Sequence, residues 1–169
     1  MGRGKDDKME YHKIETLFER DEKTFKVNPN KLKNPVYGIF KSWQFTEKID
    51  GTNIRVIWES AIDNGADAPS RPERLRFGGK SDNAQIHADL ITWLQENVTA
   101  EKLRIVFPST DVVIYGEGYG AGIQKNGGSY NKTKQIIIYD VLVGGKWWLN
   151  WENTCDVANK MGLKTVPFI

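Results

Sequence analysis

Lys48 is the side chain in this sequence with the clearest potential for chemistry. It lies between the acidic residues Glu47 and Asp50, three positions before Gly51, which permits a tight turn. A lysine amine becomes a nucleophile when burial or nearby cations lower its pKa from about 10.4. The negative charges of Glu47 and Asp50 would instead raise the pKa of the Lys48 amine. The residues alone therefore leave two interpretations open: a surface ion pair, or a nucleophile whose acidic neighbours are offset by a metal ion and a substrate.

The residues around Lys48 predict a strand that would hold it at a corner. Apolar side chains recur at every second position in Ile54, Val56 and Trp58, and we expect a strand over roughly residues 43–59. Short strands are expected around Phe18, Phe25 and Val27. Further strands are expected over residues 74–77, 112–115, 135–143, 146–149 and 164–169.

Two helices and several loops connect these strands. Helical spacing predicts helices over residues 83–97, capped by Ser81 or Asp82, and over residues 151–162, ending at Gly162. Loops are expected over residues 60–73, with a turn at Asn64-Gly65, and over residues 116–128. A hairpin turn is expected at Gly144-Gly145. Strands and helices do not alternate regularly, so the sequence predicts an α+β fold of mostly antiparallel sheet with flanking helices.

Composition narrows the class of protein. The chain has 169 residues, enough for one domain, and a net charge of +2, so that any basic surface must be local. Its single cysteine, Cys155, excludes an internal disulfide and indicates a reducing compartment, for which we expect the cytoplasm. No apolar run approaches the ~20 residues that span a bilayer. We interpret residues 1–10 as a disordered tail and residues 11–169 as one domain.

Two glycine-rich segments resemble known phosphate-binding motifs only in part. Residues 77–81 end like a P-loop, but Arg74 stands where that motif requires glycine. Residues 116–121 fit the pattern G-x-G-x-x-A, yet further glycines follow where a helix should begin. His12 and His87 lack metal-ligand spacing. We therefore interpret the two glycine-rich segments as ordinary loops. The spacing of the two histidines leads us to expect no histidine–cysteine metal site.

Three segments, in order, resemble the motifs of the covalent nucleotidyltransferases, a superfamily of DNA ligases, RNA ligases and mRNA capping enzymes. Residues 47–53 resemble its Lys-x-Asp-Gly motif, residues 115–120 its strand with a glutamate beside glycine, and residues 136–141 its aromatic–aspartate strand. The Gly-Thr-Asn after Lys48 and residues 121–126 are similar to the RNA ligase 2-like branch of ATP-dependent RNA ligases, familiar from bacteriophages. The resemblance runs from about Tyr11 to Ile169 and implies the N-terminal part of a nucleotidyltransferase domain.

The resemblance also implies roles for individual side chains. Lys48 would attack the α-phosphorus of ATP and form lysyl-AMP, and the AMP would pass to a 5′-phosphate that a 3′-hydroxyl then joins. Glu47 would accept from the adenine amino group, and Tyr139 would stack on the ring. Asn53 would donate to a phosphate or the ribose, and Glu117 would contact the ribose or a metal-bound water. The other expected nucleotide-binding residues are Ile49, Arg55 and Lys80.

Several of these roles have plainer alternatives. Arg55 fits equally well as a charge on the sheet surface. Lys80 stands where the RNA ligases carry an arginine, and lysine lacks the bidentate fork. Gln124, Lys125 and Asn126 are expected to reach nucleic acid, with a solvated loop as the alternative.

The implied cofactors are ATP and magnesium, with manganese as a substitute, and the implied partners are RNA ends or a nicked duplex bound by a monomer. The later Glu-Gly and Lys-x-Lys motifs of the family have no counterpart after Tyr139, so we expect a truncated domain that self-adenylates weakly or not at all.

A bacteriophage source, and hence the cytoplasm of an infected bacterium, is expected. The alternatives are a DNA ligase or capping enzyme with the same chemistry, and a non-catalytic module that binds nucleic acid.

Overall fold

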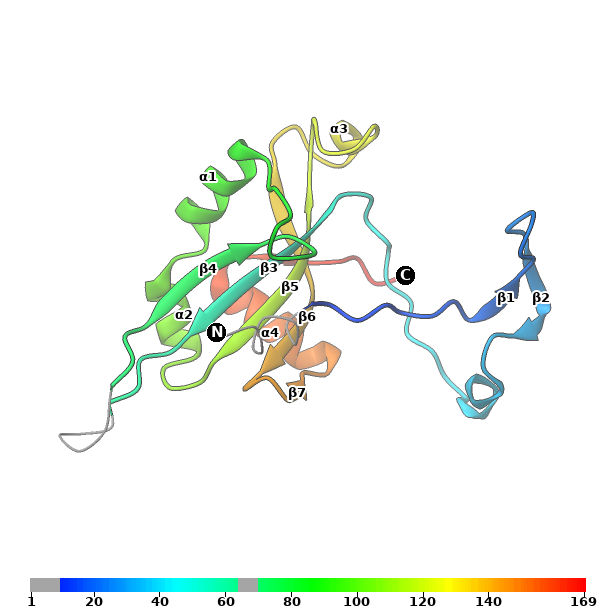
Figure 1. Cartoon of the computed structure of the whole chain (residues 1–169), viewed down its shortest axis with the longest axis horizontal. Coiled ribbons are helices and arrows are strands. Elements are labelled where there is room, and N and C mark those ends of the chain that lie inside the picture. The colour runs from blue at the N-terminus through cyan, green and yellow to red at the C-terminus, as the bar shows by residue number, and fades with distance from the viewer. Residues whose placement is uncertain (1–9, 64–69) are drawn as a thin grey trace.

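The computed structural model describes residues 10–63 and 70–169, and its centre is a six-stranded sheet (Figure 1). The strands are β3 (Thr52–Glu59), β4 (Arg74–Gly78), β5 (Val112–Tyr119), β6 (Gln135–Val143), β7 (Trp147–Trp148) and β8 (Lys164–Thr165). Their order is β4-β3-β5-β6-β7, and these neighbours are antiparallel, while β8 runs parallel to β6. The predicted α+β fold with mostly antiparallel sheet is confirmed.

Three helices cover one face of this sheet and form the main core with it. They are α1 (Ala88–Asn97), α2 (Ala100–Val106) and α4 (Trp151–Met161). The alternating residues Ile54, Val56 and Trp58 of β3 face these helices and are almost fully buried. A fourth helix, α3 (Gly127–Tyr130), lies beyond the end of β5 (Figure 1). With the helices on one face, the other face of the sheet is available for a binding site.

A bulge in β6 shapes that second face. Tyr115 pairs with Asp140 but Gly116 pairs with Ile138, so Tyr139 is the extra residue in the ladder. Such bulges redirect side chains. Here two successive residues, Tyr139 and Asp140, both line the cleft described below.

The N-terminal residues form an arm that projects from the sheet (Figure 1). It contains the hairpin of β1 (Phe18–Arg20) and β2 (Val27–Leu32) and the 3-10 helix η2 (Pro35–Ile39). Phe18 and Val27 lie in strands as expected, whereas Phe25 lies in the connecting turn with φ 56. The segment before β1 runs along the cleft.

Some element boundaries differ from the sequence-based expectation. The strand expected from residue 43 begins at Thr52, because residues 45–47 pair with the C-terminal segment, through a Thr46–Phe168 bridge and the Glu47 N–H to the Pro167 carbonyl. The helix expected from residue 83 begins at Ala88 and is capped by His87, because Asp82 is paired with Arg55.

Two further differences concern residues 97–120. The predicted loop from Gly116 instead continues β5 to Tyr119, and Gly118 permits close packing, since a Cβ there would lie 2.5 Å from Leu90. Helix α2, capped by Thr99, was not predicted. The strands expected around residues 74–77 and 135–143, the glycine hairpin and the helix ending at Gly162 are confirmed.

Residues 1–9 of the expected tail over residues 1–10, and the turn at Asn64-Gly65, lie outside the described residues. The last residue of that tail, Glu10, is described and lines the cleft. Within residues 10–63 and 70–169, no helix is both long and apolar enough to span a membrane.

Candidate functional site

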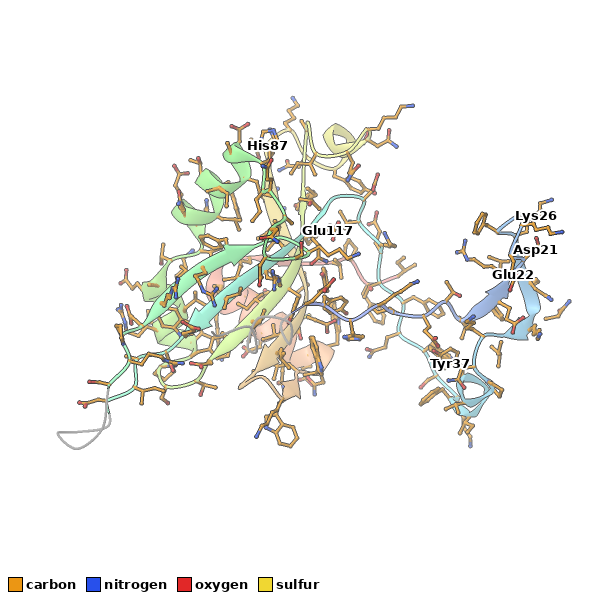
Figure 2. All side chains as sticks on the ribbon, viewed as in Figure 1. Asp21, Glu22, Lys26, Tyr37, His87 and Glu117 are labelled. Atoms are coloured by element: carbon orange, nitrogen blue, oxygen red, sulfur yellow. The ribbon has the colours of Figure 1, made fainter. Side chains whose placement is uncertain are left out.

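A cleft of about 1400 Å³ lies between the open face of the sheet and the N-terminal segment. Most of the side chains predicted to bind a nucleotide line it: Glu47, Lys48, Ile49, Asn53, Lys80, Glu117 and Tyr139. Figure 2 shows Glu117 on the central sheet, well apart from the arm that carries Lys26 and Tyr37. The structure therefore brings together residues that lie up to 92 positions apart in the chain, Glu47 and Tyr139.

Backbone contacts on both sides hold the turn that carries Lys48. The preceding Glu47 N–H donates to the Pro167 carbonyl over 2.9 Å. After the turn, the Gly51 N–H donates to the Glu117 carboxylate, and the Gly51 carbonyl accepts from Gln124 Nε2 over 3.0 Å. The Lys48 side chain is itself exposed, so the fixed backbone is what directs it toward the cleft.

Glu117 has the most informative protonation behaviour in the cleft. Burial raises the pKa of its carboxyl from 4.5 to about 7, although the Lys48 charge and the Gly51 N–H lower it and Asp50 raises it. A pKa raised this far is typical of functional carboxyls. The effect of the Lys48 charge on the Glu117 carboxyl places the two groups near each other in the cleft.

The raised pKa of Glu117 predicts a pH-dependent stability. The folded chain binds this proton more tightly than the unfolded chain, so the free energy of unfolding should fall as pH rises from 4.5 to about 7. Urea unfolding at about pH 5 and about pH 7.5 measures the fall. Glu117→Gln should reduce it, and Glu96→Gln, an exposed control on α1, should not. An equal fall in the chain and in Glu117→Gln would contradict this assignment.

Asn53 and Tyr139 form a polar pair in the cleft. Asn53 Nδ2 donates to the Tyr139 hydroxyl over 2.6 Å. Burial and the nearby Glu117 raise the pKa of Tyr139, so its hydroxyl stays protonated. Asn53 Oδ1 is buried and has no hydrogen-bond partner among the described residues. An unpartnered buried acceptor is costly, so this oxygen is suited to accept from a ligand hydroxyl or amino group.

An apolar floor lies beside this pair. Ile49, Tyr119, Ile137 and Val166 form one buried cluster, with Tyr139 and Trp151 packed against it. Ile49, Tyr139, Trp151 and Val166 also line the cleft. An aromatic and aliphatic surface next to a few polar groups suits a flat heterocyclic ring. Sequence reasoning did not assign Val166 to the site, because its contact with β6 depends on the fold.

Arg55 does not line the cleft. It is 1% exposed, and it donates through Nε to the Gly79 carbonyl over 2.7 Å and through its terminal nitrogen to Asp82 over 2.6 Å. Both partners belong to the loop that carries Lys80. Arg55 therefore holds the Lys80 loop in place, and neither the predicted ligand contact nor the alternative of a sheet-surface charge describes what it touches here.

The residues expected to reach nucleic acid separate in the structure. Gln124, with φ 57, contacts the Lys48 turn through the Gly51 carbonyl. Lys125 and Asn126 are exposed and lie outside the cleft lining, and Asn126 precedes α3. Gln124 thus supports the site, and a role for the other two residues stays a prediction.

The donor set places limits on metal binding. Among the described residues, no group of three or more His, Cys, Asp and Glu side chains could hold a metal ion. The cleft can therefore contribute Glu117 to a divalent ion, with phosphate oxygens of a ligand and water as the other donors. Magnesium is commonly bound in this way, through one or two carboxylates and substrate phosphates.

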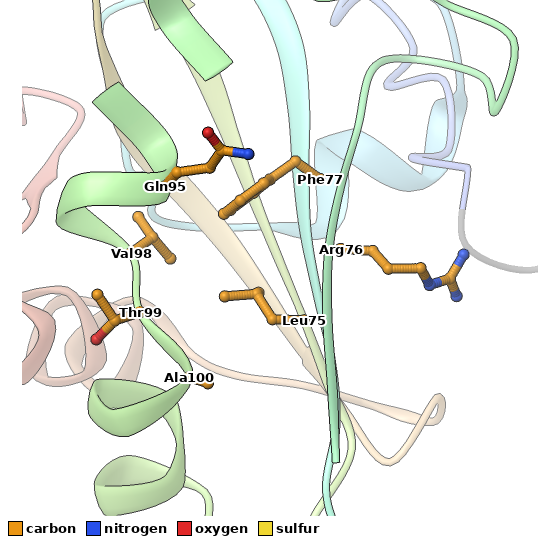
Figure 3. A pocket seen from close by; sticks show the side chains of 7 residues that line it. All are labelled: Leu75, Arg76, Phe77, Gln95, Val98, Thr99 and Ala100. Atoms are coloured by element: carbon orange, nitrogen blue, oxygen red, sulfur yellow. The ribbon is translucent and has the colours of Figure 1, made fainter. Parts of the chain in front are cut away.

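A second hollow, of about 560 Å³, lies between β4 and the helices (Figure 3). Leu75 and Phe77 face α1 and α2, while Arg76 points to the other side of β4 (Figure 3). Except for Arg76, its lining residues are apolar or uncharged. It offers no group for catalysis, which leaves the cleft at Lys48 as the candidate site.

Comparison with known proteins gives a family match and similar folds. The sequence matches the RNA ligase family over residues 41–169. A lysine-to-alanine variant of the Naegleria gruberi RNA ligase solved with ATP and Mn has a similar fold, with a TM-score of 0.55 and 17% identity over 75% of this chain and 35% of that chain. No curated protein sequence matches at a significant level.

Two further structures of the Naegleria gruberi enzyme are similar to the chain. A glutamate-to-alanine variant with ATP and Mn has a TM-score of 0.57 and 15% identity, over 75% of this chain and 36% of that chain. The enzyme with PPi has a TM-score of 0.55 and 18% identity, over 75% and 35%. The chain thus spans about a third of the length of these structures, and at these identities the likeness shows the fold.

Proposed function

Because this chain belongs to the RNA ligase family, we propose that its cleft binds ATP and that Lys48 accepts the adenylyl group. One observation carries the proposal: Lys48, Glu117 and Tyr139, which come from three separate segments, line a single cleft. The solved Naegleria gruberi structures that contain ATP and Mn, or AMP and Mn, support ATP and a divalent ion, magnesium or manganese, as the groups bound.

The chemistry follows from the nucleophile. The neutral amine of Lys48 attacks the α-phosphorus, a P–N bond forms, and the P–O bond to pyrophosphate breaks. The AMP then passes to a 5′-phosphate end of RNA, and a 3′-hydroxyl displaces it to form the phosphodiester. Covalent catalysis of this kind divides one difficult condensation into easier displacements.

The neighbouring side chains orient the nucleotide. The floor of Ile49, Trp151 and Val166, together with Tyr139, takes the adenine. Asn53 Oδ1, which lacks a partner among the described residues, accepts from the ribose. Glu47 accepts from the adenine amino group, and Glu117 contacts the ribose or a water bound to the divalent ion. Lys80, held by the loop that Arg55 fixes, contributes positive charge near the phosphates.

Nucleotide titration of the chain tests this proposal. Trp151 lines the cleft, so its fluorescence should report binding. We expect ATP to bind at least about tenfold more tightly than GTP, because guanine presents a carbonyl where Glu47 requires a donor. Tighter binding of GTP than of ATP would favour a capping-type enzyme. Binding of RNA without ATP, with an affinity that falls with salt, would overturn the proposal in favour of a nucleic-acid-binding module.

A further inference from the structure

The N-terminal strap, which we define as residues 10–20, forms the outer wall of the cleft. Seven of its residues line the cavity: Glu10, Tyr11, His12, Lys13, Ile14, Thr16 and Arg20. None of the motifs that identify the family includes them. The wall therefore requires its own explanation.

Tyr11 fixes the strap to the sheet. Its hydroxyl donates to the Asp140 carboxylate at the β6 bulge. Its ring centroid lies 5.0 Å from that of Tyr139, 5.1 Å from Tyr115 and 5.8 Å from Trp148. Aromatic rings at such separations stabilise one another beyond the burial of their area. The residue two positions further along, Lys13, is thereby placed in the cleft wall.

Lys13 and Arg20 bring two positive charges to the cleft, in addition to those of Lys48 and Lys80. None of these four side chains takes part in an ion pair within residues 10–63 and 70–169, whereas Lys31, on the same arm, pairs with Glu19 over 2.9 Å. Cations that line a cavity without a protein partner are available to an anionic ligand.

Two acids of the cleft wall already accept hydrogen bonds from the protein. Asp140 accepts the Tyr11 hydroxyl, and Glu117 accepts the Gly51 N–H. With a pKa of about 7, Glu117 is protonated for part of the time near neutral pH. Lys13 and Arg20 thus face a cavity in which two of the four carboxylates already have hydrogen-bond partners within the protein. The cavity, at about 1400 Å³, also exceeds the ~300–1,000 Å³ typical of a site for one small molecule.

We propose that the strap is a phosphate-binding wall in which Lys13 and Arg20 bind phosphate oxygens that extend outward from the Lys48 site. The inference rests on the proposed function, since a nucleotide with its adenine on the apolar floor directs its phosphates away from that floor. The phosphates come either from the β and γ groups of ATP or from the 5′ end of RNA. Both present the same chemistry to the wall.

The double variant Lys13→Ala/Arg20→Ala tests the wall. If the wall binds the β and γ phosphates, the Kd for ATP should rise about tenfold or more while the Kd for AMP stays within about twofold. If it binds an RNA end, the same loss should appear for a short 5′-phosphorylated RNA and be absent for its 5′-hydroxyl counterpart. Either pattern supports the proposal and identifies the source of the phosphate.

A matched control removes the same charge from side chains of the arm that do not line the cleft. Lys23→Ala/Lys26→Ala changes two lysines in the hairpin that lie outside the cleft lining, and Lys26 is far from Glu117 (Figure 2). This variant should bind ATP, AMP and RNA like the unchanged chain. An equal loss of affinity in both double variants would show a general effect of charge. It would overturn the proposal that Lys13 and Arg20 bind phosphate.

The remaining outcomes separate the two proposals. If the unchanged chain binds ATP, and Lys13→Ala/Arg20→Ala binds ATP and 5′-phosphorylated RNA equally well, the wall is wrong and the proposed function stands. If the unchanged chain does not bind ATP, the proposed function fails. The comparison of 5′-phosphorylated with 5′-hydroxyl RNA then decides alone whether Lys13 and Arg20 bind phosphate.

Discussion

Replacing Lys48 by alanine is expected to remove covalent labelling of the chain by α-labelled ATP. Removing a nucleophile costs enzymes on the order of 10⁶ in rate, so the labelled fraction should fall at least about a hundredfold, to background. The assay is incubation with α-labelled ATP and Mg²⁺ or Mn²⁺, followed by denaturing electrophoresis. Because Lys48 is exposed and forms no ion pair within the described residues, its loss should leave the fold intact.

Lys132→Ala provides the control for Lys48→Ala. Lys132 is also exposed, but it lies outside the cleft lining. Its variant should be labelled like the unchanged chain. Labelling of Lys48→Ala at the level of Lys132→Ala would show that another group takes the AMP. The extent of labelling of the unchanged chain tests a separate prediction, that this chain self-adenylates weakly, and robust labelling would contradict it.

Replacing Gly51 by alanine is expected to damage the site through steric contact alone. A Cβ at Gly51 would lie 2.2 Å from the Gly118 carbonyl oxygen and 2.8 Å from Glu117 Cγ. The carbonyl belongs to the backbone of a central strand and cannot move aside cheaply, so the Lys48 turn must shift. We expect a loss of about 1–3 kcal/mol in the free energy of unfolding. The Kd for ATP should rise at least about tenfold, because the shift separates Lys48 from Glu117.

The matched control for Gly51→Ala is Gly128→Ala. The atom nearest to a Cβ at Gly128 would be Ala121 Cβ, at 3.8 Å, which is an ordinary contact. Urea unfolding and ATP titration compare the two variants. If Gly51→Ala matches Gly128→Ala in both measurements, the turn is not held against β5 as the structure shows.

The sequence predicts those parts of the fold that local patterns determine. The alternation at Ile54, Val56 and Trp58 places β3, because one of its faces is buried against helices. The paired glycines at residues 144 and 145 have φ 59 and φ 67, values that glycine adopts without strain, and they form the predicted hairpin turn. The location of Lys48, Glu117 and Tyr139 in one cleft follows from adjacent strands and agrees with the motif order.

Other features depend on contacts between distant residues and could not be predicted locally. Gly116 and Gly118 are typical of a loop, yet they lie in β5 because neighbouring side chains occupy the space that a Cβ would take. Arg55 has the alternation of a sheet-surface residue, and only the fold shows that the Lys80 loop covers it. The contact of Tyr11 with Asp140 spans 129 residues and has no periodic signature.

The central claim, that Lys48 carries AMP in this cleft, is tested most directly by locating the adduct. The chain is incubated with ATP and Mn²⁺, digested, and examined by tandem mass spectrometry for a lysine modified by AMP. The account predicts that the modification occurs on Lys48 and is absent from Lys80 and Lys13, the other lysines of the cleft wall. An adduct on another residue, with Lys48 unmodified, would contradict the account.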